Sequence, residues 1–560
     1  MKVPGPRDSP RPGTFQVLLR QLSAPAGEGE ARLPERAAKR LGCPAGDIVS
    51  WRILRRSLDA RKRSRPVRRV YHLRLELPDR LREAVLRLGD PEISIEEDPA
   101  GFSPDGEPPP PPPPAPGRLL VAGAGPAGLF AALRLARAGL APLLIDRGDG
   151  LEDRRGRVAE FWGNGVLDPE SNALFGLGGA GLFSDGKLNT RHRNRAALAA
   201  ILGILAAAGA PPDILVEAEP HVGSDRLGEV VERIAAEITG LGGAVRCRTR
   251  LEGLDIRANR LRAVLLAGPG GSEELAVSAC LLAIGHSARD TQEMLVRAGV
   301  RLAAKPFAIG LRAEMPQSAI DRSQGRPAAA GAASFRLARK PGRGTAACYS
   351  FCMCPGGRVI ACASEPERLC VNGMSFRNRD GEWGNAAFLS PVGPEDFAPF
   401  RETGLSPALA GAAFQRHWEG KAWRAGASGG PYAVPACRLG EFVRGERPTL
   451  PARRGLERAA AADLRPILPE RTVLSLAEAI PALLGKLRRV NLDEVVLYGI
   501  ETRTSSPVRM LRTETGEAEG TAGLYPAGEG SGQAGGIMTS ALDGWLAAGK
   551  ILAALNSRKS

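Results

Sequence analysis

The sequence predicts a multidomain α/β protein: a domain built on a mostly parallel sheet carries an inserted cap domain and follows a small amino-terminal α+β domain. Three observations predict this organisation: a proline tract that divides the chain, strand and helix patterns that alternate on both sides of it, and glycine-rich turns at both ends of the second part. At 560 residues the chain is too long for one ordinary core. Its hydrophobic content of 43% is sufficient to bury several.

The part before the proline tract predicts a compact α+β unit. The strand patterns begin at Phe15, Ile48, Val70 and Ile93, and the helical patterns cover 33–41 and 78–88. This order, βαββαβ, is typical of a ferredoxin-like domain. We therefore expect such a domain over residues 1–106.

Residues 107–117 contain seven consecutive prolines, Pro108 to Pro114. Such a tract adopts an extended polyproline helix and acts as a semi-rigid spacer. A ligand for an SH3-type domain is the alternative interpretation. We predict a linker between two folded parts.

The residues after the linker begin with a β-α-β pattern, because apolar runs at 118–122 and 141–145 flank a helical stripe that starts at Pro126. A strand pattern and a long helical pattern return near the carboxyl terminus. We expect a discontinuous dinucleotide-binding domain over 118–305 and 495–560. The irregular, glycine-rich and proline-rich stretch 306–494 is predicted to form the cap, which would hold the substrate.

The formal charge of +15 comes mainly from arginine, with a dense run from Arg52 to Arg69. The abundance of Arg, Ala, Gly and Pro resembles the usage of a high-GC genome, so the charge does not require a nucleic-acid partner. The nine cysteines lack zinc-ligand spacing, and no apolar run is long enough to span a bilayer. We expect a cytoplasmic protein without a metal site or a membrane span, and the sequence leaves its oligomeric state open.

The segment VAGAGPAG places Gly123, Gly125 and Gly128 in the G-x-G-x-x-G spacing between the first strand and the helix. The first glycine permits the tight turn, the second lets the backbone approach a pyrophosphate, and the third allows close packing of helix and strand. Asp146 ends the next strand, where an acid would accept ribose hydroxyls. The predicted dinucleotide contacts at this end are Gly123, Gly125, Pro126, Ala127, Gly128, Asp146 and Arg147.

A second glycine-rich element, GLYPAGEGSGQAGGIM, lies near the carboxyl terminus and repeats the strand-turn-helix order. It resembles the element of glutathione-reductase-like flavoproteins whose acid binds the ribityl chain. The segment LLAIGHS resembles another signature of those proteins. The resemblance implies FAD, with contacts at Gly285, Gly528, Glu529, Gly535, Gly536 and Ile537.

Longer segments resemble one family. They include DPESNALFGLGGAGLFSDGKLNTR, KPFAIGLRAEMPQ, YSFCMCPGG, NGMSFRNR and GIETRTSSPVRM. Together they are similar to the uncharacterised FAD-dependent dehydrogenases labelled NAD(FAD)-utilizing, within the glutathione-reductase-like superfamily. The resemblance implies a Rossmann FAD-binding domain with an inserted cap, and an oxidoreductase that passes a hydride or electrons between FAD and a small molecule that the family does not define. Glu314-Met315-Pro316 departs from the family pattern, which has a histidine there.

A second dinucleotide signature with a β-α-β context is absent from the sequence, so we expect no separate nicotinamide domain. NAD(P)H could still enter the cap cleft as a transient electron donor. Two other functions stay open: a flavin-dependent RNA-modifying or nucleic-acid-bound protein, and a non-catalytic FAD module that senses redox state.

The stretch Leu174 to Arg191 is unusually rich in glycine. Glycine is favoured where the backbone must take a positive φ or let a ligand approach closely. In flavoproteins of the resembling superfamily this stretch passes the isoalloxazine ring, which implies contacts at Gly178, Gly179 and Ala180.

The candidate catalytic residues are Lys187, His286 and Arg503. Lys187 would favour an anionic reduced flavin, or would pair with Asp185. His286 would transfer a proton, or would be a hydrogen-bonded structural residue. Arg503 would hold an anionic substrate or the flavin, or would form a structural ion pair.

Cys352 and Cys354 have the spacing C-x-C, and in a strand they would share one face. A redox-active pair and the packing of two small apolar thiols are the two interpretations. The sequence does not decide between them.

Overall fold

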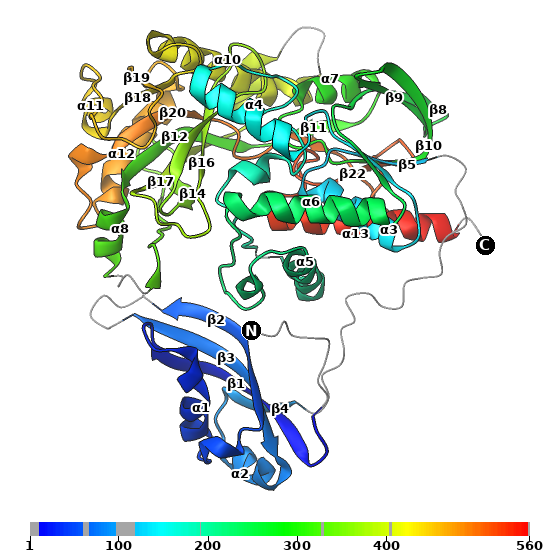
Figure 1. Cartoon of the computed structure of the whole chain (residues 1–560). Helices are drawn as coiled ribbons and strands as arrows, with labels where there is room; N and C mark the ends of the chain where they lie inside the picture. The colour runs from blue at the N-terminus through cyan, green and yellow to red at the C-terminus, as the bar shows by residue number, and fades with distance from the viewer. Residues whose placement is uncertain are drawn as a thin grey trace.

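The computed structural model describes residues 10–59, 67–96, 118–190, 192–325, 330–401 and 406–557. The predicted linker, 107–117, lies outside these residues, as does part of the arginine run. Figure 1 shows the amino-terminal unit beside a larger body that the rest of the described chain forms.

The amino-terminal unit is a four-stranded antiparallel sheet with the order β2-β3-β1-β4. Its elements are β1 (Thr14–Pro25), α1 (Leu33–Leu41), β2 (Ser50–Asp59), β3 (Arg68–Pro78), α2 (Arg82–Arg87) and β4 (Ile93–Glu96). In β3 the alternation of apolar and polar residues buries Tyr71, Leu73 and Leu75 against α1. The unit therefore has a core of its own.

The first sheet of the body has the order β7-β6-β5-β10-β9-β8, and β22 pairs with β10. Its strands are β5 (Arg118–Ala122), β6 (Leu143–Ile145), β7 (Ala244–Arg246), β8 (Arg250–Arg257), β9 (Arg260–Gly268), β10 (Gly271–Leu282) and β22 (Leu524–Pro526). β5, β6, β7, β10 and β22 pair in parallel, whereas β8, β9 and the start of β10 form an antiparallel extension. The predicted β-α-β element is confirmed.

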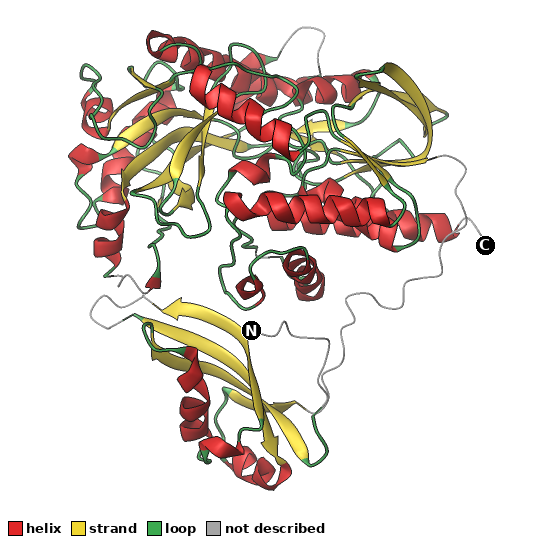
Figure 2. Cartoon of the chain, viewed as in Figure 1, coloured by secondary structure: helices red, strands yellow, loops and turns green. Residues whose placement is uncertain are grey.

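The helices of this part of the chain pack on the sheet or on one another. They are α3 (Pro126–Arg137), α4 (Leu151–Asn164), α5 (Arg195–Ala207), α6 (Ser224–Gly240), α7 (Arg289–Arg297) and α13 (Ile537–Ser557). α3, α6 and α13 run side by side, as Figure 2 shows. Small residues allow this close packing, since a Cβ atom on Gly544 of α13 would lie 2.0 Å from the carbonyl oxygen of Ala127 in α3.

The second sheet has the order β13-β14-β17-β12-β20-β18-β19. Its strands are β12 (Phe307–Pro316), β13 (Ala338–Arg339), β14 (Cys348–Cys354), β17 (Trp383–Val392), β18 (Val434–Arg438), β19 (Ala459–Ala461) and β20 (Val496–Glu501). Its helices are α8 (Gln317–Gln324), α9 (Pro394–Phe397), α10 (Ala410–Gly426), α11 (Leu439–Arg444) and α12 (Glu470–Leu484). Two small ladders accompany it: β15 (Arg358–Cys362) with β16 (Cys370–Met374), and β11 (Leu302–Ala304) with β21 (Val508–Met510).

The position of β20 corrects one predicted boundary. The sequence assigns the segment that begins at residue 495 to the dinucleotide domain, but β20 pairs with β12 and β18 of the second sheet. A fully buried strand shows an apolar run whichever sheet it joins. Its pattern alone therefore does not identify its partners.

The amino-terminal unit contacts the body through the backbone of Arg56. Its N–H donates to Val216 O at 2.6 Å, and its carbonyl accepts from Ala218 N at 2.8 Å. The Arg56 side chain also pairs with Glu217. Within the described ranges, no helix combines the length and apolar character needed to cross a membrane.

Candidate cofactor and active site

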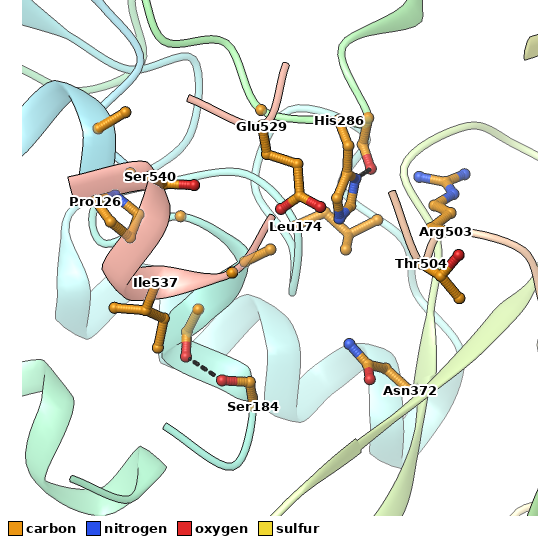
Figure 3. A pocket seen from close by; sticks show the side chains of 18 of the residues that line it. Pro126, Leu174, Ser184, His286, Asn372, Arg503, Thr504, Glu529, Ile537 and Ser540 are labelled. Atoms are coloured by element: carbon orange, nitrogen blue, oxygen red, sulfur yellow. Dashed lines mark hydrogen bonds between the residues drawn. The ribbon is translucent and has the colours of Figure 1, made fainter. Parts of the chain in front are cut away.

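A cavity of about 550 Å³ lies between the first sheet and the second sheet. One wall consists of the turn after β5, the end of β6, the glycine-rich loop, the end of β10 and the turn before α13. The other wall comes from β14, β16 and the segment after β20. Figure 3 shows Glu529 and His286 directed into this space from the first wall, and Asn372, Arg503 and Thr504 lying on the second.

The turn after β5 needs its glycines for two different reasons. A Cβ on Gly123 (φ +104°) would lie 2.3 Å from Ala283 O, and one on Gly128 would lie 1.8 Å from Gly123 O. A Cβ on Gly125 would meet only the Cα of Gly179, at 3.7 Å, and would otherwise enter the cavity. Gly123 and Gly128 therefore allow the turn itself, whereas Gly125 leaves room for a ligand at the amino end of α3.

Asp146 lies at the carboxyl end of β6 and lines the cavity. Its Oδ2 accepts from Ala124 N at 2.8 Å and its Oδ1 accepts from Gly148 N at 3.0 Å. These bonds fix the carboxylate beside the turn, and its oxygens keep further lone pairs for hydroxyl donors. The neighbouring Arg147 also lines the cavity and lies over the Phe175 ring, 4.6 Å from its centroid.

The glycine-rich loop is held by an arginine that sequence reasoning missed. Arg154 of α4 is fully buried and donates to four backbone carbonyl groups: Asn172 O at 2.9 Å, Gly176 O at 3.2 Å, Leu177 O at 2.8 Å and Gly179 O at 3.0 Å. A Cβ on Gly176 would lie 2.4 Å from Arg154 Cδ. Part of the glycine content thus accommodates the arginine side chain.

Only part of the predicted loop contacts reach the cavity. Gly179, Ala180 and Gly181 line it. Gly178 (φ +92°) faces Val231 of α6, which a Cβ would approach to 3.3 Å. The conformation of Gly178 therefore shapes the loop, and Gly179 presents it to the cavity.

The turn before α13 carries Glu529, which lines the cavity. Burial raises the pKa of Glu529 to about 7, although the backbone N–H of Gly536 and the charge of Lys305 oppose the rise. The adjacent Gly530 packs on Gly285, whose backbone nitrogen would lie 2.8 Å from a Cβ there. The ends of β10 and β22 are thereby held together at the cavity.

The other predicted residues of this turn divide into two groups. Gly536 and Ile537 line the cavity together with Gly285, whereas Gly528 and Gly535 do not. The N–H of Gly528 donates to Asp543 Oδ2 at 2.7 Å, and the N–H of Gly535 donates to Thr539 Oγ1 at 3.1 Å. These two glycines therefore shape the turn.

Lys187 forms the predicted pair with Asp185 and also lies at the cavity. It lines the cavity, its Nζ donates to Met353 O, and it lies 3.5 Å from Asp185 Oδ2. Asp185 is buried and also pairs with Arg379 and Ser375. The acid thus has two cationic partners, and a positive charge stays at the cavity wall.

His286 lines the cavity with its Nδ1 2.7 Å from Ser287 Oγ. Burial lowers its pKa to about 3, and the charges of Arg503 and Arg289 contribute. The imidazole is therefore neutral near pH 7. In this state it can donate one hydrogen bond and accept another, but it carries no charge.

Arg503 is both an ion-pair partner and a cavity residue. Its Nε and Nη2 donate to Glu419 at 3.0 and 2.8 Å, and its Nη1 donates to Ser364 Oγ at 2.6 Å. Glu419 is fully buried and also pairs with Arg289. A guanidinium has five N–H donors, so these bonds do not exhaust Arg503.

Several cavity residues were not predicted. Phe175, Thr249, Ser334, Phe335, Phe351, Asn372 and Arg379 line it. They come from segments separated by long stretches of sequence and share no motif. Among them, only Phe175 lies in a stretch whose glycine content points to a ligand site in the sequence.

The residues present fit FAD. The amino terminus of α3 faces the cavity beside Gly125, where a side chain would fill the space for a ligand. Asp146 stands at the end of the second parallel strand, and Glu529 stands in the turn before α13. These groups match a pyrophosphate, a ribose and a polyhydroxyl chain in turn. The cavity volume lies within the range of cofactor sites.

The comparisons with known proteins agree with this fit. Residues 306–504 match the family described as "FAD-dependent protein, C-terminal domain-like", and residues 17–76 match a domain of unknown function, DUF8436. An uncharacterised protein of Clostridium beijerinckii is 39% identical over 521 residues, which cover 91% of this chain and 94% of the relative. The chain belongs to this family of FAD-dependent proteins. Its cofactor is FAD.

Solved structures resemble the FAD-dependent protein more distantly. A flavoprotein/dehydrogenase from Cytophaga hutchinsonii is 12% identical, with a TM-score of 0.34, and the match covers 79% of each chain. A myxobacterial chondrochloren halogenase is 12% identical, with a TM-score of 0.35, over 79% of this chain and 75% of that one. The comparisons name no substrate for this chain.

Proposed function

We propose that the protein is a dehydrogenase-like oxidoreductase in which a small molecule enters from the cap side of the cavity and exchanges a hydride or electrons with bound FAD. The observation that carries this proposal is that two chemically different walls meet in one cavity. The first wall presents the glycine turns, Asp146 and Glu529. The second wall presents polar and cationic side chains that the cofactor motifs do not account for.

The first wall would bind and orient the cofactor. Backbone N–H groups at the start of α3 would face the pyrophosphate, Asp146 would accept ribose hydroxyls, and Glu529 would contact the ribityl chain. When bound, FAD supplies the capacity to take up and return a pair of electrons, and the protein supplies position and electrostatics.

The substrate would lie between the second wall and the part of the first wall that carries Lys187 and His286. Lys187 places a cation at the cavity, so it would stabilise negative charge that develops there. The neutral His286 would donate or accept a hydrogen bond, and Arg503 and Thr504 would orient a polar or anionic group. NAD(P)H, as a transient donor, would have to enter by this side.

The finer fold assignments are also proposals. The antiparallel order β2-β3-β1-β4 with helices after β1 and β3 supports a ferredoxin-like amino-terminal unit. The return of β22 beside β10, followed by α13, supports the glutathione-reductase-like arrangement. Its partners are proposed to be small molecules and its location to be the cytoplasm.

Anaerobic reduction tests the proposed function. The FAD-loaded protein is mixed with NADH or NADPH, the absorbance of oxidised flavin is followed, and a panel of acceptors is then added. We expect reduction by at least one nicotinamide and reoxidation by at least one acceptor. If no donor and acceptor pair supports turnover while FAD stays bound, the protein is a redox-sensing module and the proposal is wrong.

A further inference from the structure

Two cysteines stand at the cap wall of the cavity. Cys352 lines the cavity, and Cys354 lies fully buried directly behind it on the same strand, β14. Cys352 is itself partly exposed, and its neighbour Phe351 also lines the cavity and is 42% exposed. The pair therefore combines one sulfur at the cavity surface with one sulfur enclosed by protein.

The backbone of β14 is irregular at this pair. β14 pairs with β17 at Phe351↔Ala387 and then at Cys354↔Asn385, so β14 has one extra residue between the two pairings. Cys352 has a φ of +42°, which is unfavourable for a residue with a side chain. Such strain persists where the surrounding structure enforces it, and it is frequent at functional sites.

This bulge bears directly on disulfide geometry. In a regular strand, residues two apart are separated by about 6.6 Å between Cα atoms, near the upper limit that a disulfide can bridge. The bulge interrupts the extended chain, and Cys354 Sγ turns back to donate to Cys352 O at 3.3 Å. Gly373 makes room for it, because a Cβ there would lie 2.9 Å from Cys354 Sγ.

Two cations surround the pair. Arg312 Nη1 donates to Cys352 O at 3.3 Å, and Lys187 Nζ donates to Met353 O between the two cysteines. A hydrogen bond between the two thiol side chains, with the charges of Lys187 and Arg312, lowers the pKa of Cys352, and the same side-chain hydrogen bond raises the pKa of Cys354. One sulfur is thereby favoured as a thiolate and the other as a thiol.

The other cysteines of the cap differ. Cys348 precedes the pair on β14, and Cys362 and Cys370 face each other across β15 and β16. These three and Cys437 of β18 are all buried, none lines the cavity, and burial raises the pKa of each. Thiol reactivity is therefore concentrated at Cys352.

We propose that Cys352 and Cys354 form a redox-active dithiol that exchanges two electrons between the bound FAD and a substrate of the disulfide class. Only the transfer of electrons between FAD and the two cysteines, the flavin half of this inference, rests on the proposed function. The reaction of the two cysteines with an external disulfide, the thiol half, depends only on the residues of β14 and their neighbours.

The Cys352 thiolate attacks one sulfur of the external disulfide, so a mixed disulfide forms and the external S–S bond breaks. The leaving thiolate takes up a proton. Cys354 then loses its proton and attacks the Cys352 sulfur, which forms the Cys352–Cys354 bond and releases the second external thiol. In the return step this internal S–S bond accepts two electrons from the reduced cofactor together with two protons, and both thiols are restored.

The thiol half is tested without any activity assay. The protein is incubated with glutathione disulfide as the probe, and free thiols are then alkylated. The mass of the tryptic peptide that spans 344–358 is measured by mass spectrometry. We expect the peptide to lose two hydrogen atoms and to carry no glutathione. Cys354→Ser should trap glutathione on Cys352, and Cys352→Ser should prevent both products. The matched controls Cys348→Ala and Cys362→Ala should behave like the parent.

The flavin half is tested by anaerobic titration of the oxidised, FAD-loaded protein with dithionite. The parent should take up one two-electron equivalent more than Cys352→Ser or Cys354→Ala, because the disulfide is reduced in addition to the flavin. Retention of every thiol by the parent, absence of the trapped adduct, or equal uptake by parent and variants would each overturn the proposal. If the protein binds FAD but shows neither the internal disulfide nor the additional electron uptake, the dithiol proposal is wrong and the proposed oxidoreductase function is unaffected.

Discussion

Arg154 donates from Nη2 to the carbonyl oxygen of Gly179 at 3.0 Å, and this bond joins helix α4 to the loop residue that lies against the turn after β5. A Cβ on Gly179 would lie 2.8 Å from Gly125 Cα. Arg154 therefore fixes the position of the glycine-rich loop relative to the turn after β5. This position leaves the cavity open. The Arg154 side chain thus helps to shape the cofactor site.

Arg154→Met should lower the free energy of unfolding by about 3 kcal/mol, because buried carbonyl groups lose their donor. FAD affinity should fall as the loop loosens. Chemical denaturation and FAD titration measure the two effects. Arg155→Ala, at an exposed position on the same helix, is the matched control and should change neither quantity. Equal behaviour of the two variants would contradict the role given to Arg154.

Gly125→Val should remove FAD binding while the protein stays folded. Residue 125 has φ −76°, which any residue adopts, and a side chain there would point into the cavity. Circular dichroism would report the fold and FAD titration would report binding. Gly128→Val provides the contrast, because its side chain would collide with Gly123 O and should unfold the protein. A Gly125→Val variant that binds FAD like the parent would place the pyrophosphate elsewhere.

Glu529 should make the FAD-free protein less stable as the pH rises. Its pKa in the folded protein is about 7, above its ordinary value of 4.5, so the folded state binds a proton that the unfolded state has released. The neutral Glu529 carboxyl group therefore makes its full contribution to the free energy of unfolding below pH 4.5, and this contribution is lost as the pH rises from 4.5 to 7.

Glu529→Gln should therefore be more stable than the parent at pH 8, by about 1–3 kcal/mol, and similar to it at pH 4.5. Urea denaturation at both pH values measures the difference. Glu514→Gln, at an exposed acid, should show no such dependence. A constant difference between Glu529→Gln and parent across the pH range would show that Glu529 titrates normally.

Lys187→Met should lower the midpoint potential of bound flavin by tens of millivolts without releasing FAD. A positive charge in a partly dry site contributes on the order of 1–3 kcal/mol, and about 1.4 kcal/mol corresponds to 30 mV for a two-electron couple. Dye-coupled titration of variant and parent measures the shift. An unchanged potential would mean that Lys187 serves only as the partner of Asp185.

The parts of the site that follow local pattern rules were predictable. Gly123, Asp146 and Glu529 each stand at the end of a parallel strand, where spacing and strand order place them together. The cap wall was not predictable, because residues such as Asn372 and Arg379 meet only through tertiary packing. Arg154 was missed because an arginine on a polar helix is normally exposed, and only the fold shows that it is buried.

The central claim is that this cavity binds FAD, and equilibrium binding tests it most directly. The protein is purified, its flavin is released and identified, and FAD is titrated back onto the parent and the Gly125→Val variant. We expect the parent to carry FAD and to rebind it with one cofactor per chain, and the folded variant to bind none. A parent protein that is isolated without flavin and takes up no added FAD would contradict the assignment of the cavity.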